Sequence, residues 1–287
     1  MAPSMTDTLK PWPGDDVVTS RLRLYLRRSG SKGSPAVLLL HGYAVNGWMF
    51  GLLRNDLEPE FDLLVPDLRG HGLSDAPQQG WQAEDLADDI AALLDALSIP
   101  KIHTVGYSMG GFVALALAQR HPDRVDRLAL LCTAPYSSSR RRRAGLAALE
   151  QLFRRLPPEA MLGITYRLLA GPNLPPEMRE ILPMIMRHNC RRGLSGGARL
   201  LRKADLRPGL STMQHQCLLV TAEHDTAVFP RDWQALLHEV PSLRHEHFEG
   251  AGHGLAASHP KELSALLREF LTDPPDHETP PKSSSSL

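Results

Sequence analysis

Three residues of the types that cooperate in nucleophilic catalysis each follow a predicted strand: Ser108, Asp225 and His253. A serine hydroxyl is a weak nucleophile, so it needs a base to take its proton and a carboxylate to orient that base. Ser108 is the centre of GYSMG (106–110), which matches G-x-S-x-G, and Ser, Asp, His is the chain order that this motif predicts. The chemistry indicated is acyl transfer through a covalent intermediate.

The motif alone is weak evidence, because GLSGG (193–197) matches it equally well. Ser108 lies between the short β-branched run at 102–105 and the small apolar run at 110–118, which predict a buried strand followed by a buried helix. A nucleophile elbow requires that context, and the alternative role for Ser108 is a helix N-cap. Ser195 follows IMRHNCRR, which is no strand, and we interpret it as part of a flexible turn.

The base and the acid lie in loops that leave them room to meet. His253 stands between two glycines in GAGHG, and Asp225 comes directly after the apolar run of a predicted strand. Glu223 and Asp232 are alternative carboxylates close by. The candidate roles are Ser108 as the nucleophile, His253 as the base and Asp225 as the acid, with the two other carboxylates still open for the last role.

A third predicted strand ends at His41-Gly42-Tyr43. Its loop offers the backbone N–H of Tyr43, which we expect to face the N–H of Met109 across the developing negative charge. Two such donors would form the oxyanion hole that acyl transfer needs.

Apolar periodicity predicts the elements that position these residues. Short apolar or alternating runs predict strands at 21–28 (as a half-exposed edge strand), 36–42, 61–67, 102–105, 125–132, 216–223 and 243–250. Spacings of three and four predict helices at 84–97, from residue 110 onward, near 233–240 and near 263–270. This alternation predicts an α/β fold with a mostly parallel sheet and helices on both faces.

Residues 137–210 break the alternation, because their apolar stripes are helical and prolines interrupt them. We predict a helical cap over 137–210, inserted into a core formed by 20–136 and 211–272. Residues 1–19 are expected to be an N-terminal extension, and the Pro- and Ser-rich tail 273–287 is expected to be disordered.

The order of these motifs resembles the α/β-hydrolase superfamily. The resemblance covers roughly residues 20–272 and rests on the following stretches: the HG loop at 41–42, DLRGHGLSD (67–75), GYSMGG (106–111), EHDTAVFP (223–230) and GAGHG (250–254). The family usually has Gly where Ala222 stands here, whereas Val228 and Pro230 keep the family's spacing after Asp225. The resemblance therefore implies that Asp225 is the catalytic acid, rather than Glu223 or Asp232.

The resemblance implies a serine hydrolase, carboxylesterase-like, that needs no cofactor. Lactonases, thioesterases and C–C bond hydrolases of the same fold carry the same triad, so they remain alternatives. A non-catalytic, ligand-binding member of the superfamily is a further alternative.

The composition of the chain narrows the classes of binding partner. Lys plus Arg and Asp plus Glu are balanced at 32 each, which gives no field that would attract nucleic acid. No run approaches 18 apolar residues, and the chain begins without an apolar leader segment, so neither a membrane span nor a signal peptide is predicted. Three cysteines without CxxC spacing favour a reducing, cytoplasmic setting.

We expect a small-molecule, ester-type substrate with an apolar acyl group, since the cap carries an apolar stripe at Met161, Ile164 and Leu168. The oligomeric state is left open. The cap methionines (Met161, Met178, Met184 and Met186) either line a pocket or fill the cap's own core.

Other conspicuous side chains are given structural roles. His41 and His71 are expected to order their loops by hydrogen bonding, as are Asp67 and Arg69 after their strand. His245 and His247 alternate on one strand face without further ligands at metal-binding spacing, so no metal site is predicted. We interpret Arg140 to Arg143 as a solvated loop.

Overall fold

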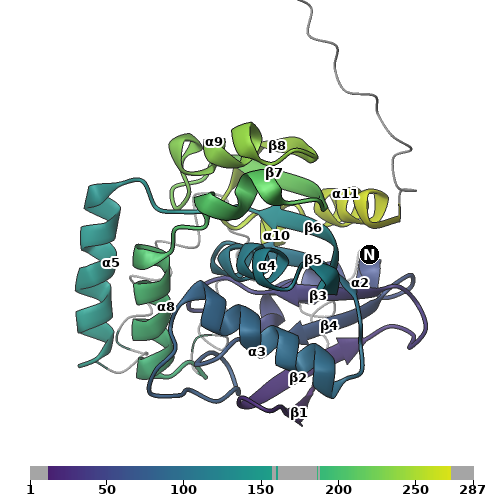
Figure 1. Cartoon of the computed structure of the whole chain (residues 1–287), viewed down its shortest axis with the longest axis horizontal. Coiled ribbons are helices and arrows are strands. Elements are labelled where there is room, and N and C mark those ends of the chain that lie inside the picture. Colours follow the sequence, from purple (N-terminus) through teal and green to yellow (C-terminus); the bar gives the residue numbers. More distant parts are fainter. Residues whose placement is uncertain (1–11, 157–159, 161–185, 187, 273–287) are drawn as a thin grey trace, which may run out of the picture.

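The computed structural model describes residues 12–156, 160, 186 and 188–272. Its described part contains an eight-stranded sheet with the order β1-β2-β4-β3-β5-β6-β7-β8 (Figure 1). The strands from β4 to β8 run parallel, whereas β1 and β2 are antiparallel to their neighbours. The strand bounds are β1 Asp15–Val18, β2 Arg23–Ser29, β3 Ala36–Leu40, β4 Asp62–Pro66, β5 Ile102–Tyr107, β6 Val125–Leu131, β7 Gln216–His224 and β8 Leu243–Gly252.

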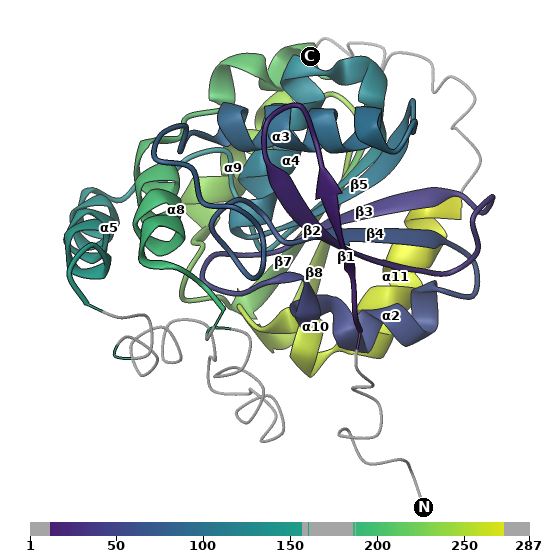
Figure 2. The same ribbon diagram turned by 90° about the horizontal axis from the view of Figure 1, so that it is seen from below.

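Helices cover both faces of the sheet (Figure 2), and the predicted fold class is confirmed. Two buried apolar clusters separate the layers, one beneath α3, α4 and α9 and the other beneath α2, α10 and α11. The helix bounds are α2 Gly51–Leu57, α3 Ala83–Ala96, α4 Met109–Arg120, α9 Pro230–Glu239, α10 Leu255–Ser258 and α11 Pro260–Thr272, with short 3-10 helices at Gly47–Phe50 and Pro122–Arg124.

The prediction of an edge strand at 21–28 was wrong. β2 pairs with β4 on one side and with β1 on the other, where Val17 faces Leu24. The alternation at 21–28 reflects one buried face of an interior strand rather than an open edge. Residues 15–18 therefore belong to the sheet, whereas we expected the N-terminal extension to continue to residue 19.

The described residues between β6 and β7 are mainly helical: α5 (Arg140–Phe153), α8 (Arg191–Lys203) and the 3-10 helix η4 (Arg207–Thr212). Residues 140–143 are the first turn of α5 rather than a solvated loop. The hydroxyl oxygen of Ser139 caps this turn by accepting a hydrogen bond from the Arg142 N–H, and the Arg142 guanidinium pairs with buried Asp232 at 2.8 Å.

Ser195 lies inside α8 and not in a flexible turn, so that interpretation was wrong. It is 8% exposed, and its hydroxyl donates to the carbonyl of Arg192 within the same helix. The neighbouring glycines pack closely: a Cβ at Gly193 would overlap the carbonyl of Gly70, and one at Gly196 would overlap the ring of Trp81. The glycines therefore allow α8 to lie directly on the core.

A third apolar cluster joins the two helices to the core through Ala44, Phe153, Met186 and Leu194. Met186 is thus a packing residue. Met161, Ile164, Leu168, Met178 and Met184 lie outside the described residues, as does the tail 273–287. No helix in the described ranges is long and apolar enough to cross a membrane.

Candidate active site

The predicted catalytic residues meet at one edge of the sheet. Ser108 follows β5, Asp225 follows β7 and His253 follows β8. These strands are parallel, so their carboxyl ends lie along the same edge, where α/β folds place their ligand sites. Residues 145 positions apart in the chain are thereby brought into contact.

Ser108 occupies a strained turn between β5 and α4. Its backbone has φ 52° and ψ −113°, a region that residues with a side chain rarely adopt. Its side chain makes no capping hydrogen bond to α4, which argues against the N-cap alternative. A Cβ at Gly106 would lie 2.5 Å from the carbonyl oxygen of Gly110, and one at Gly110 would overlap that of Leu40, so the sharp turn requires both glycines.

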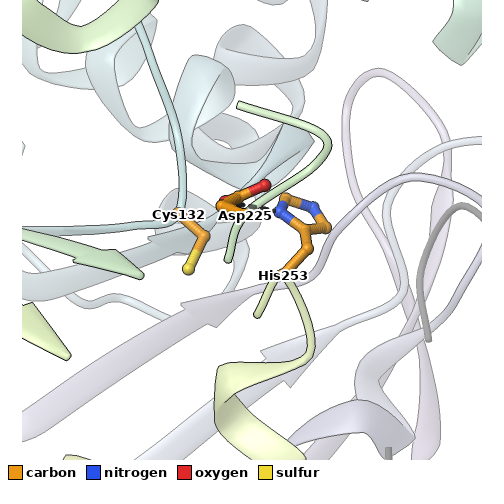
Figure 3. A group of neighbouring side chains, drawn as sticks. All are labelled: Cys132, Asp225 and His253. Atoms are coloured by element: carbon orange, nitrogen blue, oxygen red, sulfur yellow. Dashed lines mark hydrogen bonds and ion pairs between the residues drawn. The ribbon is translucent and has the colours of Figure 1, made fainter. Parts of the chain in front are cut away.

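A hydrogen-bonded relay links the three side chains. Ser108 Oγ lies 3.0 Å from Nε2 of His253, and Nδ1 of His253 lies 2.9 Å from Oδ2 of Asp225 (the second contact is drawn in Figure 3). The side chains of His253 and Asp225 are 3% and 5% exposed. If Nδ1–H donates to the carboxylate, Nε2 is left as the acceptor for the Ser108 hydroxyl.

The environment of Asp225 keeps it ionised. Its Oδ1 accepts hydrogen bonds from the N–H groups of Ala227 at 2.7 Å and Val228 at 2.8 Å. Burial opposes ionisation, but His253 and these two donors outweigh it and lower the pKa of Asp225 below its ordinary value. Asp225 is therefore a carboxylate at neutral pH.

The two alternative carboxylates have other partners. Asp232 is fully buried and accepts hydrogen bonds from Ser138 and Arg142. Glu223 is exposed and accepts from the N–H of Gly250 at 2.8 Å. Of the three candidates, Asp225 is the one that contacts His253.

The loop after β3 lies next to the serine. A Cβ at Gly42 would be 3.5 Å from Cβ of Ser108, so the backbone that carries Tyr43 borders the elbow. Met109 is the first residue of α4, where a helical N–H has no partner within the helix. Among the described residues, no acceptor takes the N–H of Tyr43 or Met109. The Tyr43 hydroxyl donates to the carbonyl of Leu194 in α8 at 2.7 Å.

Two residues next to the relay were missed by the sequence analysis. Cys132 directly follows β6 with φ 46°, and its buried thiol lies within 4.8 Å of a carboxylate oxygen of Asp225, whose side chain is its neighbour in Figure 3. The Tyr107 hydroxyl donates to the carbonyl of His253. The rule that strand ends carry functional residues would have indicated Cys132, because β6 lies between β5 and β7 in the sheet.

Cys132, Asp225 and His253 also form a group whose donor atoms lie within 4.8 Å of one another, as a metal site would require. Burial and the Asp225 charge raise the pKa of the Cys132 thiol well above its ordinary value. A thiolate, the form that binds metal, is thus disfavoured at neutral pH. His253 and Asp225 are already hydrogen-bonded to each other, so the group fits a relay with a supporting thiol better than a metal centre.

The four other histidines that the sequence analysis considered have local partners. His41 Nε2 accepts from the N–H of Leu68 at 2.8 Å and lies edge-on to His71. Burial lowers the pKa of His41 to about 4 and that of His71 to about 3, so both are neutral. His245 and His247 both contact the Thr221 hydroxyl.

Comparison with known proteins places this chain in a family. Residues 35–163 match the family described as alpha/beta hydrolase fold. The chain is 31% identical over 253 residues to a pimeloyl-[acyl-carrier protein] methyl ester esterase of Neisseria meningitidis, covering 85% of this chain and 96% of that protein. The chain belongs to the α/β-hydrolase family.

Other similar proteins have different names, and one of them is a hydrolase of a different named activity. An AB hydrolase superfamily protein of Bacillus subtilis is 26% identical over 82% of this chain and 90% of its own length. The crystal structure of an enol-lactonase from Burkholderia xenovorans superposes with a TM-score of 0.83 at 25% identity, covering 90% of this chain and all of that one. The family is one of hydrolases, and its members differ in the bond they cleave.

Proposed function

We propose that this α/β-hydrolase cleaves carboxylic esters through an acyl-enzyme formed on Ser108. The observation that carries the proposal is the continuous relay from Ser108 Oγ through His253 to Asp225, at 3.0 and 2.9 Å. Its nucleophile stands on a strained turn, as an elbow does, and its acid is held ionised.

The proposed reaction begins when Nε2 of His253 takes the Ser108 proton as Oγ attacks the ester carbonyl carbon. The N–H groups of Tyr43 and Met109 stabilise the oxyanion, and each such donor contributes roughly 3–4 kcal/mol in enzymes where it has been removed. His253 then protonates the departing alkoxide, which leaves as an alcohol. A water activated by His253 hydrolyses the acyl-enzyme and restores Ser108. Asp225 orients the imidazole and stabilises its protonated form.

Esters are the proposed substrates because an alkoxide leaves more readily than the amide anion that cleavage of an amide bond would have to expel, so an ester requires less of the site. The methyl ester esterase of Neisseria meningitidis is a relative over most of the chain, which agrees with this choice. We further propose an apolar acyl group of medium length. Support for this comes from the sequence of the cap, whose apolar stripe lies outside the described residues.

Two matched serine variants test the proposal. Ser108→Ala and Ser195→Ala both remove a hydroxyl from a G-x-S-x-G match, yet the Ser195 hydroxyl donates to the carbonyl of Arg192 within α8. We expect Ser108→Ala to lose about 10⁴-fold or more in kcat on p-nitrophenyl esters, because triad members act as a unit, and Ser195→Ala to keep near-wild-type kcat. Equal losses in both variants, or an active Ser108→Ala, would contradict the assignment.

A second measurement separates the enzyme from a non-catalytic, ligand-binding protein. A fluorophosphonate should label the folded wild-type protein stoichiometrically on Ser108 and leave Ser108→Ala unlabelled. A panel of acetyl to decanoyl esters, with a lactone and a thioester of the best acyl group, then ranks the bond classes by kcat/KM. Faster cleavage of the lactone or thioester would replace the ester proposal.

We also propose that residues 137–210 form a cap on a core of 20–136 and 211–272. The described part of that insertion supports this division, because α5 and α8 pack chiefly on each other. A cytoplasmic location is proposed because all three cysteines are unpaired.

A further inference from the structure

A groove outside the relay runs along the pair of helices α5 and α8. It has a volume of about 680 Å³ and lies between these helices and the loop that leads into α3. Its lining comprises Ala76, Gln78, Trp81, Glu150, Arg154, Cys190, Arg191, Arg192, Ser195, Gly196 and Arg199. No residue of the proposed triad is among them.

The groove carries an excess of positive charge. Four of its described lining residues are arginines, at positions 154, 191, 192 and 199, and Glu150 is the one acid among them. Glu150 is 3% exposed, and its carboxylate lies 3.8 Å from Arg154, 3.3 Å from Arg199 and 2.7 Å from Arg202. A single carboxylate shared in this way cannot neutralise four guanidinium groups, so the described lining residues carry a formal charge of +3.

The N-terminus of α8 opens on the same groove. Cys190 is the N-cap, and its sulfur accepts the N–H of Gly193 at 3.2 Å. Arg191 and Arg192 come next, and no acceptor among the described residues takes their backbone N–H groups. The first N–H groups of a helix and its dipole attract anions, and arginine guanidinium groups bind phosphate oxygens in a fork.

We propose that this groove binds a phosphate group, as a free ion or as a phosphate ester. A phosphate dianion offers three terminal oxygens and a charge close to that of the lining, whereas a monocarboxylate would leave most of the arginine donors unpaired. The inference does not rest on the esterase proposal.

Isothermal titration calorimetry on the full chain at low ionic strength tests the site. The probes are inorganic phosphate, coenzyme A and pantetheine, the last of which lacks phosphate. If coenzyme A binds more tightly than inorganic phosphate, the ligand is a phosphate ester. If the two bind with equal affinity, the ligand is the free phosphate ion. Pantetheine should bind at least ten times more weakly than coenzyme A. The proposal would be overturned if neither inorganic phosphate nor coenzyme A showed saturable binding, or if pantetheine bound as tightly as coenzyme A.

Variants locate the binding. Arg191→Ala removes an exposed arginine that pairs with no acid among the described residues, so folding should be unaffected. We expect it to weaken phosphate binding about tenfold, as the loss of one charge-assisted contact would. The matched control Arg207→Ala removes an exposed arginine that pairs with Asp205 outside the groove, and it should bind as the wild type does. Equal losses in both variants would show a diffuse charge effect and refute the site.

Ser108→Ala should bind phosphate unchanged, because Ser108 does not line the groove. An inactive enzyme that still binds phosphate, or an active one that does not, therefore tells the two proposals apart.

Discussion

A single methyl group at Gly193 should weaken the attachment of α8 to the core. The Cβ of Gly193→Ala would overlap the backbone carbonyl of Gly70, which cannot rotate away as a flexible side chain would. Gly70 is itself fixed by a hydrogen bond from its N–H to the carbonyl of Asp75 at 2.8 Å. The helix and the loop must therefore separate, and overpacking of this kind costs about 1–3 kcal/mol.

Gly145→Ala in α5 is the matched control, since its Cβ would meet nothing within 4 Å. Alanine favours helix over glycine by about 1 kcal/mol, so Gly145→Ala should be more stable than the wild type. The difference between the two variants cancels this preference and leaves the steric cost of about 1–3 kcal/mol. Urea unfolding, compared at equal m-values, measures it. If Gly193→Ala had the same unfolding free energy as Gly145→Ala, the close packing of α8 against the core would be refuted.

Three further substitutions test single side chains. Asp225→Asn should lower kcat on p-nitrophenyl esters about 10⁴-fold with the fold retained, because the amide no longer fixes the imidazole tautomer; a loss below tenfold would remove Asp225 as the acid. Buried neutral His71 has a pKa of about 3, so the unfolded chain takes up a proton near pH 6.5 that the folded protein refuses. Its contribution to stability is therefore complete above pH 6.5 and is lost as the pH falls toward 3. When the pH is lowered from 7 to 5, the unfolding free energy of the wild type should fall by about 2 kcal/mol more than that of His71→Gln. An equal fall in the two proteins would contradict this. Glu150→Gln leaves three arginines without their shared carboxylate and should cost about 1–3 kcal/mol in urea unfolding, less at high salt, whereas a salt-independent loss would point to packing instead.

Strand ends were the most predictable part of the molecule. A buried parallel strand needs a short apolar run, and the polar residue that follows it must lie at the carboxyl edge of the sheet. Ser108, Asp225 and His253 could be found by that rule, and it applies equally to Cys132. The side-chain contacts themselves could not be found in this way. The thiol beside Asp225 depends on a left-handed backbone at residue 132, which no local pattern shows.

The edges of the sheet and the short elements were harder to predict. β1 has four residues, Asp15–Val18, of which none is buried, so it has no apolar signature and is held by pairing with β2. α2 (Gly51–Leu57) is too short for a helical period to stand out, although it packs against α11. In both places tertiary contacts decide the structure rather than local preference.

The two G-x-S-x-G segments show most directly what a motif omits. Around Ser108 the glycines remove side chains that would collide within a sharp turn, and the serine points to His253. Around Ser195 they remove side chains from one face of a regular helix, and the serine bonds its own backbone. Glycine meets both demands because it lacks a Cβ, so the same letters satisfy two unrelated constraints. The preceding strand distinguishes the two segments. Only a chain that leaves the extended strand β5 and enters α4 at once must turn sharply at the serine.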